Sequence, residues 1–177
     1  MKTTLSNRLA EAINNQINAE LWSAYLYLSM SMDQEAKGNK GIANWFFVQF
    51  REEQDHARIF MNYLNARGAE VKLQPIAAVD TEWATTLDAF KQTLAHEQKV
   101  TALINNLMHI AVEDKDFASQ STLQWFIDEQ VEEEENARNI IDALSKIGDN
   151  SYGVYMYDKE LAARVYTLAA PLAATAR

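Results

Sequence analysis

Apolar residues recur at intervals of three and four positions over four long stretches of the chain, which is the period of an amphipathic α-helix. Glycine, proline and helix-capping residues supply the boundaries. They place the four long helices at about 6–36, 42–67, 83–113 and 118–147, followed by a short helix at about 156–170. The pattern therefore predicts an all-α protein.

Local residue types support these boundaries. Ser6 and Thr81 are candidate N-caps, because their hydroxyls can accept a hydrogen bond from a free N–H group of the first helical turn. Gly68 and Gly148 stand where the C-terminus of a helix favours a left-handed residue. Pro171 is expected to stop the short last helix.

The lengths of the connections predict how the helices are arranged. Short joints after the first and third long helices make each pair an antiparallel hairpin. The joint from Gly68 to Glu82 is different, because it can span roughly 50 Å when extended and so run along helices of about 40 Å. We expect a four-helix bundle with one long crossover between the second and third helices, in one domain over residues 1–177.

Polar residues interrupt the apolar stripe of every long helix near its midpoint. The six interruptions are Glu20, Glu53, His56, Glu97, Gln130 and Glu133. Each lies within about three residues, or roughly 4 Å of axial rise, of the middle of its helix. Because the middles of equally long helices meet in a bundle, these six side chains should converge at one level of the core.

Four buried carboxylates need a counter-charge, because burying an unpaired charge costs several kcal/mol. No lysine or arginine occupies the stripes at that level, and two divalent cations would balance the four charges. Oxygen-rich ligation with one imidazole suits iron or manganese better than zinc or copper. Glu53 and His56 lie three residues apart, so both can reach one ion. His96 and His109 lie off the stripes and are assigned to packing or the surface.

Composition narrows the function further. The 25 acidic and 16 basic residues give a formal charge of −9, which argues against a nucleic acid as the main partner and leaves cations open as partners. The absence of cysteine excludes disulfides, thiolate metal sites and cysteine nucleophiles. Neither a signal sequence nor an apolar run of about 18 residues is visible. We therefore expect a cytoplasmic protein without a membrane partner.

The motifs around the six positions resemble those of the ferritin family, specifically the bacterial non-haem ferritins. The resemblance covers nearly the whole chain and rests on Glu20, EEQDH ending at His56, HEQ around Glu97, WFIDEQVEEE and YDKEL. Ferritin-like di-iron bundles in general have Glu-x-x-His on two helices. Here Gln130-x-x-Glu133 replaces the second such motif, as in true ferritins. Gln54 stands where haem-binding bacterioferritins have methionine, so no haem is expected.

The resemblance implies a role for individual residues. The ligands of the first iron would be Glu20, Glu53, which bridges the two ions, and His56. The second iron would be surrounded by Glu97, Gln130 and Glu133. A third iron site would be formed by Glu52, Glu129 and Glu132. Tyr27 and Trp125 would lie beside the centre as candidate electron donors.

The activity that the resemblance implies is ferroxidase activity with iron storage. O₂ or H₂O₂ would oxidise Fe(II) to Fe(III) at the di-iron centre, and ferric mineral would collect inside a hollow shell of 24 identical subunits. One alternative is a di-iron peroxidase or oxygenase acting on another substrate, which predicts a second Glu-x-x-His. Another is a bundle whose carboxylates hold metal only for structural reasons.

Overall fold

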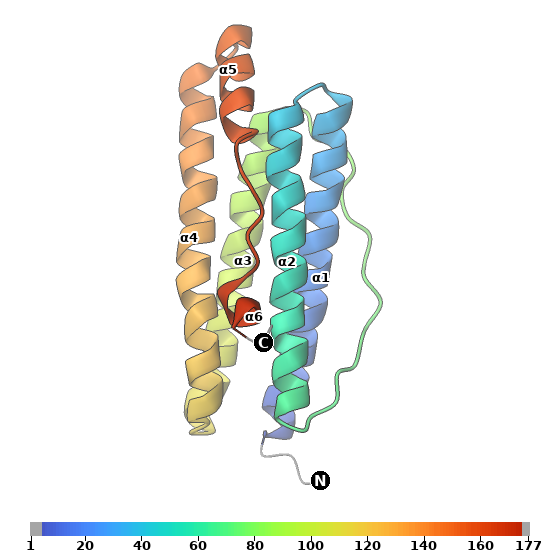
Figure 1. The fold of residues 1–177 in the computed structure, drawn as a ribbon, viewed down its shortest axis with the longest axis vertical. Helices are drawn as coiled ribbons and strands as arrows, with labels where there is room; N and C mark the ends of the chain where they lie inside the picture. The colour runs from blue at the N-terminus through green and yellow to red at the C-terminus, as the bar shows by residue number, and fades with distance from the viewer. Residues whose placement is uncertain (1–4, 175–177) are drawn as a thin grey trace.

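Four long helices form a bundle in the computed structural model, which describes residues 5–174 (Figure 1). They are α1 (Asn7–Ala36), α2 (Lys40–Ala66), α3 (Thr86–Glu113) and α4 (Phe117–Ile147), and two short helices follow, α5 (Ser151–Leu161) and α6 (Ala170–Ala173). Over the described range there are no strands. None of the helices in this range has an apolar stretch long enough to cross a membrane.

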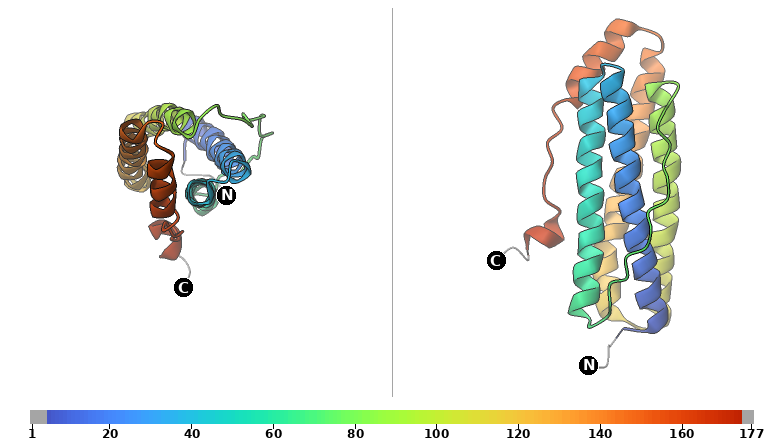
Figure 2. Two further views of the ribbon diagram at one scale, coloured as in Figure 1. Left: turned by 90° about the horizontal axis from the view of Figure 1, so that it is seen from above. Right: turned by 90° about the vertical axis from the view of Figure 1, so that its right-hand side faces the viewer.

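The connections have the predicted topology. Short joints make α1 and α2 antiparallel, and likewise α3 and α4. The segment 67–85 runs along the length of the bundle, from the end of α2 to the start of α3 (Figures 1 and 2). The helices α2 and α3 therefore point the same way, which confirms the four-helix bundle with one long crossover.

Three of the four predicted caps are confirmed, and one is wrong. The Ser6 hydroxyl accepts from the Leu9 N–H at 3.2 Å, and Gly68 and Gly148 have φ angles of 71° and 55°. Thr81 does not cap a helix, because α3 begins at residue 86 and the hydroxyl of Thr85 accepts from the N–H of residue 88 at 3.0 Å. The crossover continues to residue 85, and near its end the side chain of Trp83 is buried in the core.

The short C-terminal helix was predicted with the wrong bounds. Instead of one helix over 156–170, α5 ends at residue 161 and α6 begins at residue 170. The C-terminal strap, defined here as residues 162–169, connects them (Figure 1). The helix α5 begins early because the side chain of Asn150 accepts from the Gly153 N–H at 3.1 Å. Pro171 lies in the first turn of α6, where its missing N–H costs nothing, so it does not stop a helix.

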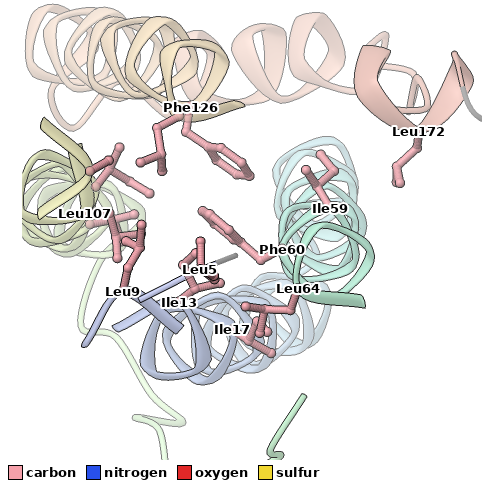
Figure 3. Packing of buried hydrophobic residues seen from close by; sticks show 14 residues of the cluster. Leu5, Leu9, Ile13, Ile17, Ile59, Phe60, Leu64, Leu107, Phe126 and Leu172 are labelled. Carbon is pink, nitrogen blue, oxygen red and sulfur yellow. The ribbon is translucent and has the colours of Figure 1, made fainter. Parts of the chain in front are cut away.

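Two apolar clusters fill the bundle, one on each side of its central polar level. In the cluster of Figure 3, the rings of Phe60 and Phe126 from α2 and α4 stack with centroids 4.0 Å apart. In the other cluster, Phe46 and Phe90 from α2 and α3 stack at 4.7 Å. The two clusters keep water from reaching the central level along the bundle axis, so charges there experience a low dielectric.

Candidate metal centre

The structure buries all six side chains that interrupt the apolar stripes. Each is at most 4% exposed, and they come from all four long helices. These side chains are Glu20, Glu53, His56, Glu97, Gln130 and Glu133. Their burial confirms the predicted polar level inside the core. Their roles as metal ligands stay predictions.

Glu20, Glu53 and His56 form the tightest group of ligating atoms. One atom from each lies within 4.8 Å of the others, and all three residues are buried. The Glu53 Oε2 atom lies 3.4 Å from His56 Nδ1. One oxygen of each carboxylate, Glu20 Oε2 and Glu53 Oε2, has no hydrogen-bond partner. Leaving such atoms unsatisfied is costly in a protein core, and a bound cation would satisfy both.

Burial changes the protonation of the carboxyl groups. It raises the pKa of Glu20 and of Glu53 well above the ordinary range for glutamate, and neighbouring carboxylates add to the effect. The pKa of Glu97 is also raised by burial. Burial, with the charge of Glu97 second, raises the pKa of Glu133 to about 8. Burial therefore favours the protonated form of each group more than water does, and a cation would compete with those protons.

Side-chain amides hold the carboxylates on the other half of the level. The Gln130 amide donates to Glu97 Oε2 at 3.2 Å and to the Glu97 carbonyl at 3.2 Å. The Gln49 amide donates to Glu133 Oε2 at 2.9 Å. A side-chain amide is neutral, so its N–H group can orient a carboxylate without adding charge.

Two glutamines beside the carboxylates were given no role in the sequence analysis. Gln16 donates to Glu20 Oε1 at 2.8 Å, and Gln49 donates to Glu133. Both are buried. A signal was present in each case, because Gln49 lies on the apolar stripe of its helix and Gln16 precedes Glu20 by one helical turn.

Two aromatic residues lie beside the group, as the resemblance implies. The Tyr27 hydroxyl donates to Glu97 Oε1, and burial together with the charge of Glu97 raises the pKa of this phenol well above its usual value. The centroids of the Trp125 and His56 rings lie 5.5 Å apart. Electron donation by either residue stays a prediction. His96 packs against the neighbouring helix α1, as expected, and its ring forms a hydrogen bond of 2.7 Å with the hydroxyl of Ser23. Burial lowers the pKa of His96 to about 4.

The residues implied in a third iron site are less enclosed. Glu52 and Glu129 are half-buried, and Glu132 is exposed. Burial raises the pKa of both Glu52 and Glu129. Among residues 5–174, one group of three or more acidic or histidine side chains has its ligating atoms within 4.8 Å of one another, and it consists of Glu20, Glu53 and His56. The third-site residues form no comparable group. Their role stays a prediction.

Comparison with known proteins identifies the family. The family model described as a ferritin-like domain matches residues 10–147. The bacterial non-heme ferritin of Staphylococcus aureus (strain USA300) is 41% identical over 162 residues, which is 92% of this chain and 98% of that protein. The protein of the same name from Staphylococcus haemolyticus (strain JCSC1435) is 43% identical over the same shares.

Solved structures agree with this match. An open pore ferritin from the hyperthermophilic archaeon Archaeoglobus fulgidus superposes with a TM-score of 0.91 at 42% identity, over 92% of this chain and 100% of that one. A humanized archaeal ferritin gives 0.92 at 43% identity, over 93% and 99%. The matches cover most of the sequence and most of the fold, so this chain belongs to the ferritin family.

Proposed function

We propose that this protein stores iron and is a ferroxidase that oxidises Fe(II) to Fe(III) with O₂ or H₂O₂ at a two-iron centre inside each subunit. The observation that supports it best is the pair of buried, unpartnered oxygens on Glu20 and Glu53 beside His56. A core that holds such atoms next to an imidazole is suited to a divalent cation. Iron is here the substrate and the stored product.

The charges of the centre suit the uptake of Fe(II) and its oxidation. Glu20, Glu53 and His56 would hold one Fe(II), and Glu53 would also reach a second ion that Glu97 and Glu133 would bind. The four carboxylates balance the charge of two Fe(II) ions. Carboxylate oxygens are hard ligands that favour Fe(III) over Fe(II), so they help each ion to lose an electron to the oxidant. Hydrolysed Fe(III) would then move to a mineral store.

Neutral groups complete the centre. Gln130 offers an amide oxygen to the second ion while its N–H groups stay on Glu97. Tyr27, whose hydroxyl donates a hydrogen bond to Glu97, would give an electron to the oxidant. Two apolar clusters exclude water on either side and so strengthen the attraction between carboxylates and iron.

We further propose that 24 subunits form a hollow shell in the cytoplasm, each a single ferritin-like domain over residues 1–177. The resemblance to the ferritin family supports this assembly. At −9 per subunit, 24 subunits carry a formal charge of −216, a field that attracts Fe(II). Glu52, Glu129 and Glu132 would form a weaker third iron site that ions pass through, and no haem would bind, since Gln54 replaces the methionine of bacterioferritins.

The alternative, a di-iron peroxidase or oxygenase acting on another substrate, is less well supported. It predicts a second Glu-x-x-His motif, and α4 carries Gln130 and Glu133 at the matching positions.

Aerobic mixing of the metal-free protein with Fe(II) tests the proposal. Wild type should oxidise iron much faster than buffer does, and Glu53→Ala should abolish the fast phase. Glu135→Ala is the matched control, because Glu135 lies on the exposed face of α4 and should leave the rate unchanged. Equal rates for Glu53→Ala and wild type would show that the centre is misplaced. If size-exclusion chromatography shows only monomers or dimers, the proposed shell of 24 subunits is wrong.

A further inference from the structure

The C-terminal strap is attached to the bundle along α2 (Figures 1 and 2). The side-chain amide of Asn44 donates to the Arg164 carbonyl at 2.9 Å, and the Tyr166 hydroxyl donates to Asp55 Oδ2 at 2.6 Å. At the end of the strap, the buried side chain of Leu172 on α6 packs against the apolar cluster (Figure 3). The strap therefore has a defined position relative to the metal centre.

Arg164 of the strap directs its guanidinium group at the third-site carboxylates. Its Nη2 atom lies 2.5 Å from Glu52 Oε2 and also donates to Gln49 Oε1. Its Nη1 atom donates to the Trp45 carbonyl at 3.3 Å, and the guanidinium stacks over the Trp45 ring at 4.4 Å. Polar and aromatic partners on α2 thus hold the charged group in one place.

This position is directly connected to the two-iron centre. Gln49 accepts from Arg164 with its oxygen and donates to Glu133 with its nitrogen, so one amide links the strap to a proposed iron ligand. Glu52 is the chain neighbour of Glu53, the proposed bridging ligand. Arg164 therefore lies at the border between the enclosed centre and the more exposed carboxylates.

A guanidinium and a metal ion compete for the same carboxylate. The N–H group of Arg164 bonds to Glu52 Oε2. It places a fixed positive charge beside this carboxylate, and that charge repels a metal ion approaching the same group. A tethered cation is always present at high local concentration, whereas a third metal ion must be drawn from solution.

We propose that Arg164 is a tethered cation that takes the place of a metal ion at Glu52, so that each subunit binds two metal ions while the strap is docked and a third only when Arg164 leaves. The proposal rests on the two-iron centre of the proposed function. It assigns to Arg164 control over how many ions a subunit holds.

Counting bound metal ions tests this inference. The probe is Zn²⁺, which is not oxidised, titrated calorimetrically into the assembled, metal-free protein. Wild type should bind two ions per chain and Arg164→Gln should bind three. Arg164→Lys, which keeps the positive charge, should stay at two. Adding Glu52→Gln to Arg164→Gln should return the count to two, which locates the extra ion at Glu52.

The control is Arg8→Gln, which removes another arginine paired with carboxylates, at the far end of α1. It should leave the count at two. Equal counts and affinities for wild type and Arg164→Gln would overturn the role of Arg164, as would a third ion that persists in the double variant. A wrong assignment of the two-iron centre would give a different result. Wild type would then bind fewer than two Zn²⁺ ions per chain, and Glu53→Ala would bind as many as wild type.

Discussion

Replacing Glu133 by glutamine should make the metal-free protein more stable at neutral pH, although it removes a proposed iron ligand. Glutamine has nearly the same shape and cannot ionise. The side chain is fully enclosed, and the Gln49 amide that donates to Glu133 Oε2 can donate equally to an amide oxygen at residue 133. The substitution thus removes the cost of the charge and keeps the packing.

The size of the effect follows from the pKa of Glu133, which burial raises from 4.5 to about 8. At pH 7 the group is mostly protonated in the folded protein and ionised in the unfolded chain, so folding must take up a proton. With 1.36 kcal/mol for each pKa unit, this uptake costs about 3 kcal/mol at pH 7. For a chain of this size, such a gain corresponds to a rise in Tm of roughly 6–12 °C.

The sign of the pH dependence is part of the prediction. A carboxyl group with a raised folded-state pKa destabilises the fold increasingly as pH rises from 4.5 to about 8. The advantage of Glu133→Gln should therefore be small near pH 4.5 and grow toward pH 8. With Zn²⁺ present, wild type should become more stable than Glu133→Gln, because the metal binds wild type more tightly and so stabilises it more.

Thermal and denaturant unfolding of both metal-free proteins at several pH values, in the same assembly state, supplies the measurement. A Glu133→Gln variant that is less stable than wild type at pH 7, or a difference that does not change with pH, would refute the reasoning about burial.

Three further predictions follow from the same geometry. Zn²⁺ binding should release protons at pH 7 and tighten as pH rises, because burial raises the pKa of Glu133 to about 8; titration in buffers of different ionisation enthalpy would detect this, and a proton count of zero contradicts it. Phe126→Ala should cost about 3–5 kcal/mol in denaturant unfolding, since a buried ring is lost from the core, whereas exposed Phe117→Ala should change stability by less than about 0.5 kcal/mol. Tyr27→Phe should slow iron oxidation in the first turnover, followed by stopped flow, because the phenol can neither give an electron nor bond to the neighbouring carboxylate; a wild-type rate would exclude both roles.

Periodicity in the sequence was enough to predict most of the bundle. The buried residues of α4, from Leu123 through Gln130 and Glu133 to Leu144, recur at intervals of three and four positions, the spacing from which the helix was predicted. The same spacing placed the polar interruptions of four helices at one level. This succeeds because a helix turns at a constant rate, so the burial of one residue determines which of its neighbours share the same face.

The ligand chemistry was also largely readable from the chain. Acidic residues on an apolar stripe conflict with the core unless a cation compensates them, and the absence of cysteine leaves oxygen and nitrogen as ligands. Three-residue spacing brought Glu53 and His56 to one side of α2. What spacing could not give is the orientation of Glu20 and Glu133, whose carboxylates accept hydrogen bonds from the amides of Gln16 and Gln49.

Only the tertiary structure determined the C-terminal segment. Its composition suggested a helix over 156–170, but the strap turns at 162–163 and has no helix over 164–169, where the side chains of Arg164 and Tyr166 bind carboxylates on α2 more than 100 positions earlier in the chain. An extended segment has no repeating pattern of burial, so nothing local in its sequence records those contacts. The sequence alone determined the helices and the level at which their acidic groups meet. Which side chains contact one another across helices depends on how the helix faces pack, and only the folded structure determines that.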